Sequence, residues 1–188
     1  MKEDIDFFDE YWRTICQLSS DIDPKNFASL AKAIMKCHRD GGKIILVGNG
    51  GSAAIASHVA VDLTKAAGIR AMSFNEASFL TCFANDFGYD RWVEKALEFF
   101  ADNCDLVILI SSSGNSENIV NGAWHCLRRG IPLVTLSGFD AVNPLRSVNG
   151  LSFWVDSKSY NHVETVHQTW LLATVDFVIK IKDQHSLK

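Results

Sequence analysis

The sequence predicts an α/β fold, a three-layer α/β/α sandwich with a five-stranded parallel sheet and additional N-terminal helices. Short apolar runs alternate along the chain with longer segments of helical periodicity, which is the pattern of a sheet covered by helices on both faces. Two of these runs, within 43–50 and 105–116, are almost wholly aliphatic and end in turns rich in glycine or serine. Because ligands of open parallel sheets bind at strand carboxyl ends, both turns are candidate binding elements.

Two helices are expected first, at about 3–20 and 25–40; Pro24 suits a first helical turn, and Gly41-Gly42 ends the second helix. The run KIILVGNG is too short for a helix and predicts a buried strand, and a helix follows from Ser52. The further strands are expected at 70–74, 105–111, 132–138 and 151–157. The further helices are expected at 78–86, 91–102, 117–130 (stopped by Gly130) and 162–182.

Composition limits the function classes. The 188 residues are 47% apolar and 21% charged, and they suit one globular domain spanning 1–188. A net charge of -4 argues against non-specific nucleic-acid binding. No apolar run is long enough for a membrane helix, and the acidic start does not resemble a signal peptide. Five cysteines without a CxxC motif favour buried, reduced thiols in a cytoplasmic protein.

The turns GNGGS and SSSGNS share one chemistry. Glycines let a ligand approach the backbone, and the first N–H groups of a helix can accept a phosphate. Ser52 could cap its helix or bind a phosphate oxygen. The alternative is that each turn merely caps its helix, but two such turns at one sheet edge favour a ligand. Neither turn has the spacing of a dinucleotide or ATP motif.

The ordered combination of GNGGSA, His58, Asp62, ANDFGY and ISSSGNS resembles the sugar isomerase (SIS) family, over about residues 25–180. Within that family it is most similar to the isomerases of seven-carbon sugar phosphates. The resemblance implies a flavodoxin-like fold and a homotetramer with active sites between subunits, in which helices 1–40 take part. It implies interconversion of sedoheptulose 7-phosphate and a heptose 7-phosphate in bacterial lipopolysaccharide or capsule synthesis.

The resemblance also implies which residues meet the substrate. Three groups are carried over by position: first-turn contacts, a pair from the NDFG turn, and phosphate-binding serines. In that order they are Asn49, Gly50 and Ser52; Asn85 and Asp86; and Ser111, Ser113 and Ser116.

Proton-transfer residues are expected on two helices. His58 and Asp62 are four residues apart and so share a helix face with Ala54 and Lys65. The family has Glu where this chain has Asp62, Gln at Glu164, and a second acid/base His at Leu172. Glu164 and His167 are therefore the candidates for a rearranged proton shuttle. Turnover on the family substrate is expected to be slow or absent, with binding retained.

Cofactor and alternative functions depend on the same positions. Some relatives hold zinc at positions matching His58, Asp62, Glu164 and Leu172. Three of these four positions keep a possible ligand in this chain, so a zinc ion bound by three residues is considered. A tightly bound structural metal is not expected. An isomerase acting on another sugar phosphate is one alternative. A second is a non-catalytic sugar-phosphate-binding or regulatory protein, like the relative that associates with a bacterial replication initiator.

Overall fold

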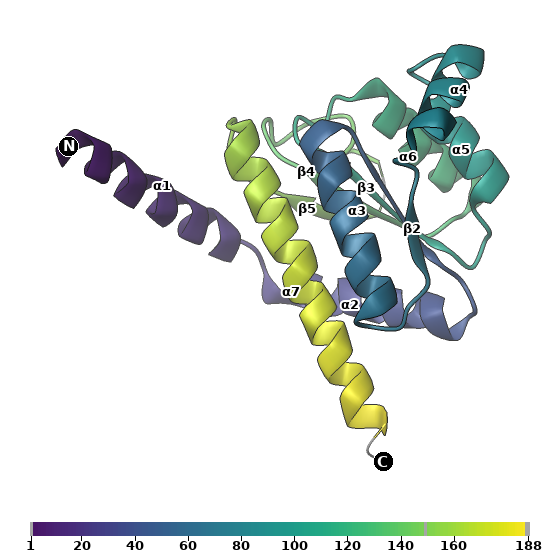
Figure 1. Ribbon diagram of the computed structural model, residues 1–188, viewed down its shortest axis with the longest axis horizontal. Coiled ribbons are helices and arrows are strands. Elements are labelled where there is room, and N and C mark those ends of the chain that lie inside the picture. The colour runs from purple at the N-terminus through teal and green to yellow at the C-terminus, as the bar shows by residue number, and fades with distance from the viewer. Residues whose placement is uncertain (1, 149, 187–188) are drawn as a thin grey trace.

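A five-stranded, all-parallel sheet forms the centre of the protein (Figure 1). The computed structural model describes residues 2–148 and 150–186. The strand order is β2-β1-β3-β4-β5. The strands are β1 (Ile44–Gly48), β2 (Ala71–Ser73), β3 (Leu106–Ser111), β4 (Leu133–Ser137) and β5 (Leu151–Trp154). The α/β class and the parallel sheet predicted from sequence are confirmed.

Helices cover both faces of this sheet (Figure 1). The helices are α1 (Lys2–Ser20), α2 (Pro24–Arg39), α3 (Gly50–Lys65), α4 (Ala77–Phe87), α5 (Trp92–Phe100), α6 (Glu117–Arg129) and α7 (Tyr160–Ser186). Helices α2 and α6 end at glycines, as predicted. Gly41 and Gly130 have φ values of 78° and 68°, a left-handed backbone conformation that favours glycine.

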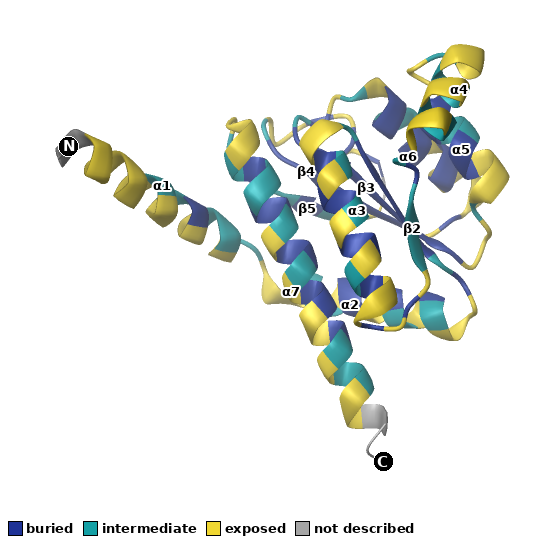
Figure 2. Cartoon of the chain, viewed as in Figure 1, coloured by how far each residue is buried: buried dark blue, intermediate teal, exposed yellow. Residues whose placement is uncertain are grey.

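The alternating side chains of each strand divide the interior into two cores. Ile44 and Leu46 of β1 face one core, which α2, α3 and α7 complete, whereas Ile45 and Val47 face the other, which α5 and α6 complete. Burial on both faces explains why β1 and β3 are continuously apolar (Figure 2).

The helices that follow β1 and β3 pack on opposite faces. These two strands are neighbours, with Gly48 paired to Ile110. Helix α3 packs in the core of α2 and α7, and α6 packs in the core of α5. The chain thus diverges at the carboxyl ends of β1 and β3, which is the switch point where open sheets bind ligands.

Helix α1 and helix α2 differ in how they use their aromatic residues. Helices 1–40 were expected to take part in oligomerisation, but Leu30 of α2 is buried in the core of its own chain. Phe27 packs against the same core, with its ring tilted against Phe153 and edge-on to Trp170, so these two side chains are held within one subunit. Helix α1 projects from the body (Figure 1) and packs against α7. Its exposed apolar residues are Ile5, Phe7, Phe8 and Trp12.

The cysteines are all unpaired, but the prediction that they are buried is only partly right. Cys37 and Cys126 are buried, and burial raises the pKa of the Cys126 thiol to about 12. Cys16, Cys82 and Cys104 are exposed, since each lies on the outer side of a helix or in a turn.

None of the helices in the described part of the chain is both long enough and apolar enough to span a bilayer.

Candidate active site

Three adjoining cavities lie at the carboxyl ends of β1 and β3. The first, the amide cavity, has a volume of about 530 Å³ and is lined by Asn49, Tyr89, Asp90, Ser116, Glu117 and Asn118. The second, the serine cavity, has a volume of about 110 Å³. It is lined by Asn49, Ser52, Ile110, Ser111, Ser112, Ser113, Ser116, Tyr160 and Glu164. It shares Asn49 and Ser116 with the amide cavity.

The third, the α7 cavity, lies between α3, α7 and α1. Its volume is about 330 Å³, and it is lined by Tyr11, Gly51, Ala54, Ile55, Asn161, Glu164, Thr165 and Gln168. Glu164 lines both this cavity and the serine cavity. The two cavities therefore adjoin at Glu164.

Residues 111–116 form a serine-rich loop, which is held by hydrogen bonds within the loop and by close packing of Gly114 against Asn143. Ser111 Oγ donates to Ser116 Oγ at 3.0 Å, and the N–H of Asn115 donates to Ser113 Oγ at 3.2 Å. Gly114 has a φ of 71°, and a Cβ there would overlap the side chain of Asn143. Only glycine fits this turn, which brings the loop hydroxyls to one cavity.

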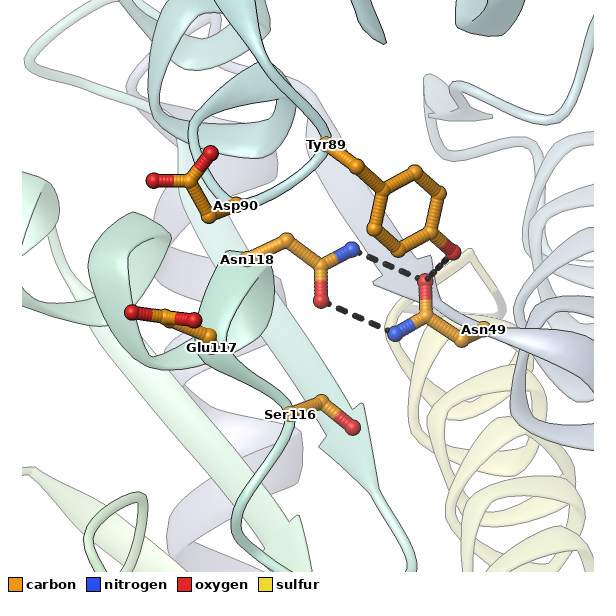
Figure 3. Close-up of a pocket in the computed structure, with 6 residues that line it drawn as sticks. All are labelled: Asn49, Tyr89, Asp90, Ser116, Glu117 and Asn118. Atoms are coloured by element: carbon orange, nitrogen blue, oxygen red, sulfur yellow. Dashed lines mark hydrogen bonds between the residues drawn. The ribbon is translucent and has the colours of Figure 1, made fainter.

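The N-termini of α3 and α6 are not capped by the side chains of their N-cap residues. Neither N-cap residue, Asn49 for α3 or Ser116 for α6, makes a side-chain capping bond. Asn49 instead exchanges two amide hydrogen bonds with Asn118, at 3.0 and 2.9 Å, and accepts one from Tyr89 at 3.2 Å (Figure 3). The first N–H groups of both helices, with the positive ends of their dipoles, are thus directed at the cavities.

Of the expected first-turn contacts, Asn49 and Ser52 line the cavities, whereas Gly50 lines none of them. Helix α3 begins at Gly50, two residues before the predicted Ser52. Ser52 is therefore not the N-cap residue; it is buried, and its Oγ lies 3.3 Å from Ser112 Oγ. Ser112, a hydroxyl of the SSSGNS turn outside the expected set of phosphate ligands, donates to Glu164 Oε1 at 3.2 Å.

His58 and Asp62 form a pair on the outer face of α3. His58 Nε2 lies 3.3 Å from Asp62 Oδ2, as their spacing predicts, and both side chains are partly exposed. His58 Nδ1 lies 3.2 Å from Nε2 of Gln168, which lines the α7 cavity. Gln168 thus connects the cavity to the titratable pair. Its position four residues after Glu164 could have indicated a shared helix face.

His167 is not at the site. Its side chain is fully buried, and its Nε2 donates to the carbonyl oxygen of Ser137 at 3.1 Å, whereas Nδ1 has no partner. Burial lowers the pKa of His167 to about 4, so the ring is neutral at pH 7. The prediction that His167 transfers protons to a substrate is wrong because position 167 faces the core, while positions 164 and 168 face the cavity.

Two further predicted positions lie elsewhere. Asn85 and Asp86 are exposed on α4, where Asn85 Nδ2 donates to Asp86 Oδ1 at 2.9 Å, and neither lines the three cavities. Leu172 packs against the core below α7. The substrate role of the α4 pair remains a prediction.

The side chains considered for zinc do not converge. Among the described residues, no group of three or more His, Cys, Asp or Glu side chains is placed to hold a metal ion. His58 lies between Asp62 and Gln168, and Glu164 is bonded to Ser112. As arranged here, these residues do not fit a three-ligand zinc site.

Comparison with known proteins identifies the family. Residues 6–138 match the model of the SIS domain. The chain belongs to the SIS domain family.

Similarity to individual members of the SIS family extends over most of the chain. The phosphoheptose isomerase of Colwellia psychrerythraea is 34% identical over 142 residues, which are 71% of this chain and 72% of that protein. The phosphoheptose isomerase of Shewanella piezotolerans is 32% identical over 79% of this chain and 80% of its own length. The structure of phosphoheptose isomerase from Neisseria gonorrhoeae superposes with a TM-score of 0.85 at 25% identity, covering 94% of this chain and 98% of that one.

Proposed function

We propose that this SIS protein is a sugar-phosphate aldose–ketose isomerase that interconverts sedoheptulose 7-phosphate and a heptose 7-phosphate. The observation that carries the proposal is the succession of neighbouring polar elements: the serine cavity and the α7 cavity share Glu164, and Gln168 of the α7 cavity contacts the His58–Asp62 pair. The names of the similar proteins, which are phosphoheptose isomerases, support the same substrate.

The serine cavity binds the phosphoryl group in this proposal. Neutral hydroxyl donors and the N–H groups at the start of α6 hold a phosphate without a lysine. The donors are Ser111, Ser113 and Ser116. With the phosphoryl group fixed there, the hydroxyl-bearing chain extends into the α7 cavity, and its carbonyl end approaches His58 and Asp62.

The isomerisation needs one proton moved between carbons and another between oxygens. Asp62 acts as the base that removes the proton from the carbon beside the carbonyl, which gives an enediol, and returns it to the neighbouring carbon. His58, 3.3 Å from Asp62, carries the proton between the two oxygens. Gln168 fixes the imidazole ring through Nδ1. No net proton is gained or lost.

Assembly and location belong to the same proposal. The aromatic face of α1 is exposed over Phe7, Phe8 and Trp12, and Tyr11 of the same helix lines the α7 cavity. A second copy that covers this face would seal the site against water, in a symmetric tetramer. A monomer in light scattering at micromolar concentration would contradict this.

A cytoplasmic location in the lipopolysaccharide or capsule pathway fits five unpaired thiols.

Asp62→Asn tests the chemistry. It should lower kcat by about 10²- to 10⁴-fold while leaving the affinity for sedoheptulose 7-phosphate nearly unchanged, since the carboxylate acts on the transition state. Asp21→Asn, on the exposed turn between α1 and α2, is the matched control and should keep full activity. Equal turnover in both variants would place the base elsewhere.

Leu172 keeps a second function open to test. An apolar residue at the family's acid/base position favours a non-catalytic sugar-phosphate-binding protein, whereas the similar proteins favour the isomerase. Slow turnover by the native protein that rises in Asp62→Glu/Leu172→His would assign the difference to these two positions. Binding without turnover in both proteins would favour the non-catalytic function.

A further inference from the structure

Two helix starts at this site can attract an anion, but only one is free to do so. The N-cap residues of both α3 and α6 lack a capping bond. The start of α6 faces serine hydroxyl groups, which donate to a phosphoryl oxygen. The start of α3 faces a side chain of the protein that is itself an anion, Glu164.

Glu164 lies directly against the first turn of α3. A Cβ added at Gly51 would overlap Oε2 of Glu164 and lie 2.6 Å from its Cδ, so the carboxylate occupies the space beside the helix start. Ser112 donates to the other oxygen, Oε1, at 3.2 Å. A carboxylate at a helix N-terminus is favourable, and here it takes the place of a ligand anion.

No cation balances Glu164 in the cavities that it lines. The residues around the serine cavity and the α7 cavity include no lysine or arginine, and Glu164 is their one carboxylate. Among the described residues no ion pair of Glu164 is found either. A phosphoryl group in the α7 cavity would meet this carboxylate without a compensating positive charge, whereas a ligand hydroxyl group could donate to it.

We propose that Glu164 determines substrate specificity by reserving the start of α3 for hydroxyl groups, so that the site selects sugars with one terminal phosphoryl group and rejects sugar bisphosphates. The proposal rests on the proposed function, since it assumes that the phosphoryl group binds in the serine cavity. The proposal sets the orientation of the substrate as well as its chemical class. The phosphorylated end of the sugar lies at α6, and the end with the carbonyl and hydroxyl groups lies at α3.

The test compares two ligands that differ by one phosphoryl group, sedoheptulose 7-phosphate and sedoheptulose 1,7-bisphosphate, by calorimetry at pH 8. The wild-type protein should bind the monophosphate about 10- to 100-fold more tightly, because like charges brought together are strongly unfavourable. Glu164→Gln keeps an acceptor for Ser112 and removes the charge. In this variant the preference for the monophosphate should become at least about fivefold smaller, and the part that remains comes from Asp62 near the carbonyl end.

Asp176→Asn is the matched control. Asp176 is exposed on the same helix as Glu164, about three turns away, and lines none of the three cavities, so its loss changes the net charge equally but should preserve the wild-type ratio of affinities. Glu164→Ala serves as a second variant, and its preference should fall in the same way if charge, not shape, is responsible. Circular dichroism checks that each variant is folded.

The outcomes separate this inference from the function on which it rests. If the proteins bind sedoheptulose 7-phosphate but Glu164→Gln and Glu164→Ala keep the wild-type ratio, the specificity role is wrong and the proposed function stands. Equal binding of both ligands by the wild type also overturns it. Failure of the wild type to bind either ligand overturns the proposed function, and the inference with it.

Discussion

The carboxyl ends of β1 and β3 differ from that of β4 in what their polar side chains contact. At β4, Ser137 Oγ accepts a hydrogen bond from Asn143 and Ser137 O accepts one from His167, and all three residues are buried. At β3, the serine hydroxyl groups bond to one another and to Glu164 on the walls of open cavities.

This difference separates polar residues that stabilise the fold from those available to a ligand. Polar groups that are paired within the protein and line no cavity are costly to remove, and they offer nothing to a substrate. Hydroxyl groups and helix N–H groups on a cavity wall can exchange their partners for a phosphate. Substitutions at β3 should therefore change binding, whereas substitutions at β4 should change stability.

The largest effect is expected from Ser113→Ala/Ser116→Ala. Each hydrogen bond to a charged group contributes about 1.5 to 3 kcal/mol, so affinity for sedoheptulose 7-phosphate in calorimetry should fall by about 100-fold or more. The free energy of unfolding should change little. Ser20→Ala/Ser29→Ala, which removes two hydroxyl groups far from the site, should bind normally. Unchanged affinity in the first variant would remove the phosphate site.

Asn143→Ala should be the most destabilising change at the carboxyl end of β4, where the polar groups are paired within the protein. The Asn143 amide donates to Ser137 Oγ and to the carbonyls of Gly138 and Asp140, and its oxygen accepts from the N–H of Arg146. At about 1 kcal/mol for each bond, urea unfolding should show a loss of about 3 to 4 kcal/mol.

Asn121→Ala is the comparison for this change. The partly buried Asn121 side chain donates to one carbonyl, that of Asp90, so its removal should cost about 1 kcal/mol or less. If Asn143→Ala were no more destabilising than Asn121→Ala, the distinction between the carboxyl end of β4 and that of β3 would not hold.

His167 should make stability depend on pH. Its pKa falls from 6.5 to about 4 on folding, so the unfolded chain binds the proton more readily between these values. Stability from this residue is therefore complete above pH 6.5 and decreases as the pH falls toward 4. By pH 4.5 the loss should be about 2.5 kcal/mol.

Urea unfolding at pH 7 and pH 4.5 measures this effect. His167→Gln lacks the titrating group and should lose about 2.5 kcal/mol less than the wild type on acidification. Binding of sedoheptulose 7-phosphate at pH 7 should persist in this variant. The same acid sensitivity in both proteins would show that His167 is not the group responsible.

The sequence predicted the fold better than the site. Alternation of apolar runs with helices was enough for the parallel sheet, because burial on both faces of β1 and β3 requires aliphatic runs there. The two turns were placed correctly for the same reason: strand ends that are neighbours in the sheet bring GNGGS and SSSGNS together.

The remaining site residues depended on helix rotation and on contacts distant in sequence. His167 and Gln168 differ by one position, about 100° around α7, so one faces the core and the other the cavity. Tyr11 reaches the α7 cavity through its helix, where its ring packs edge-on against His162 at 4.9 Å. Nothing in the local sequence of α1 indicates that approach.

NMR of sedoheptulose 7-phosphate in heavy water with the purified protein tests the isomerase activity directly. We predict that the wild-type protein exchanges the proton on the carbon beside the carbonyl for deuterium and forms the aldose. Asp62→Asn should bind the sugar phosphate without either change. Binding by the wild type with neither exchange nor aldose would contradict the isomerase, and exchange that persists in Asp62→Asn would contradict the assigned base.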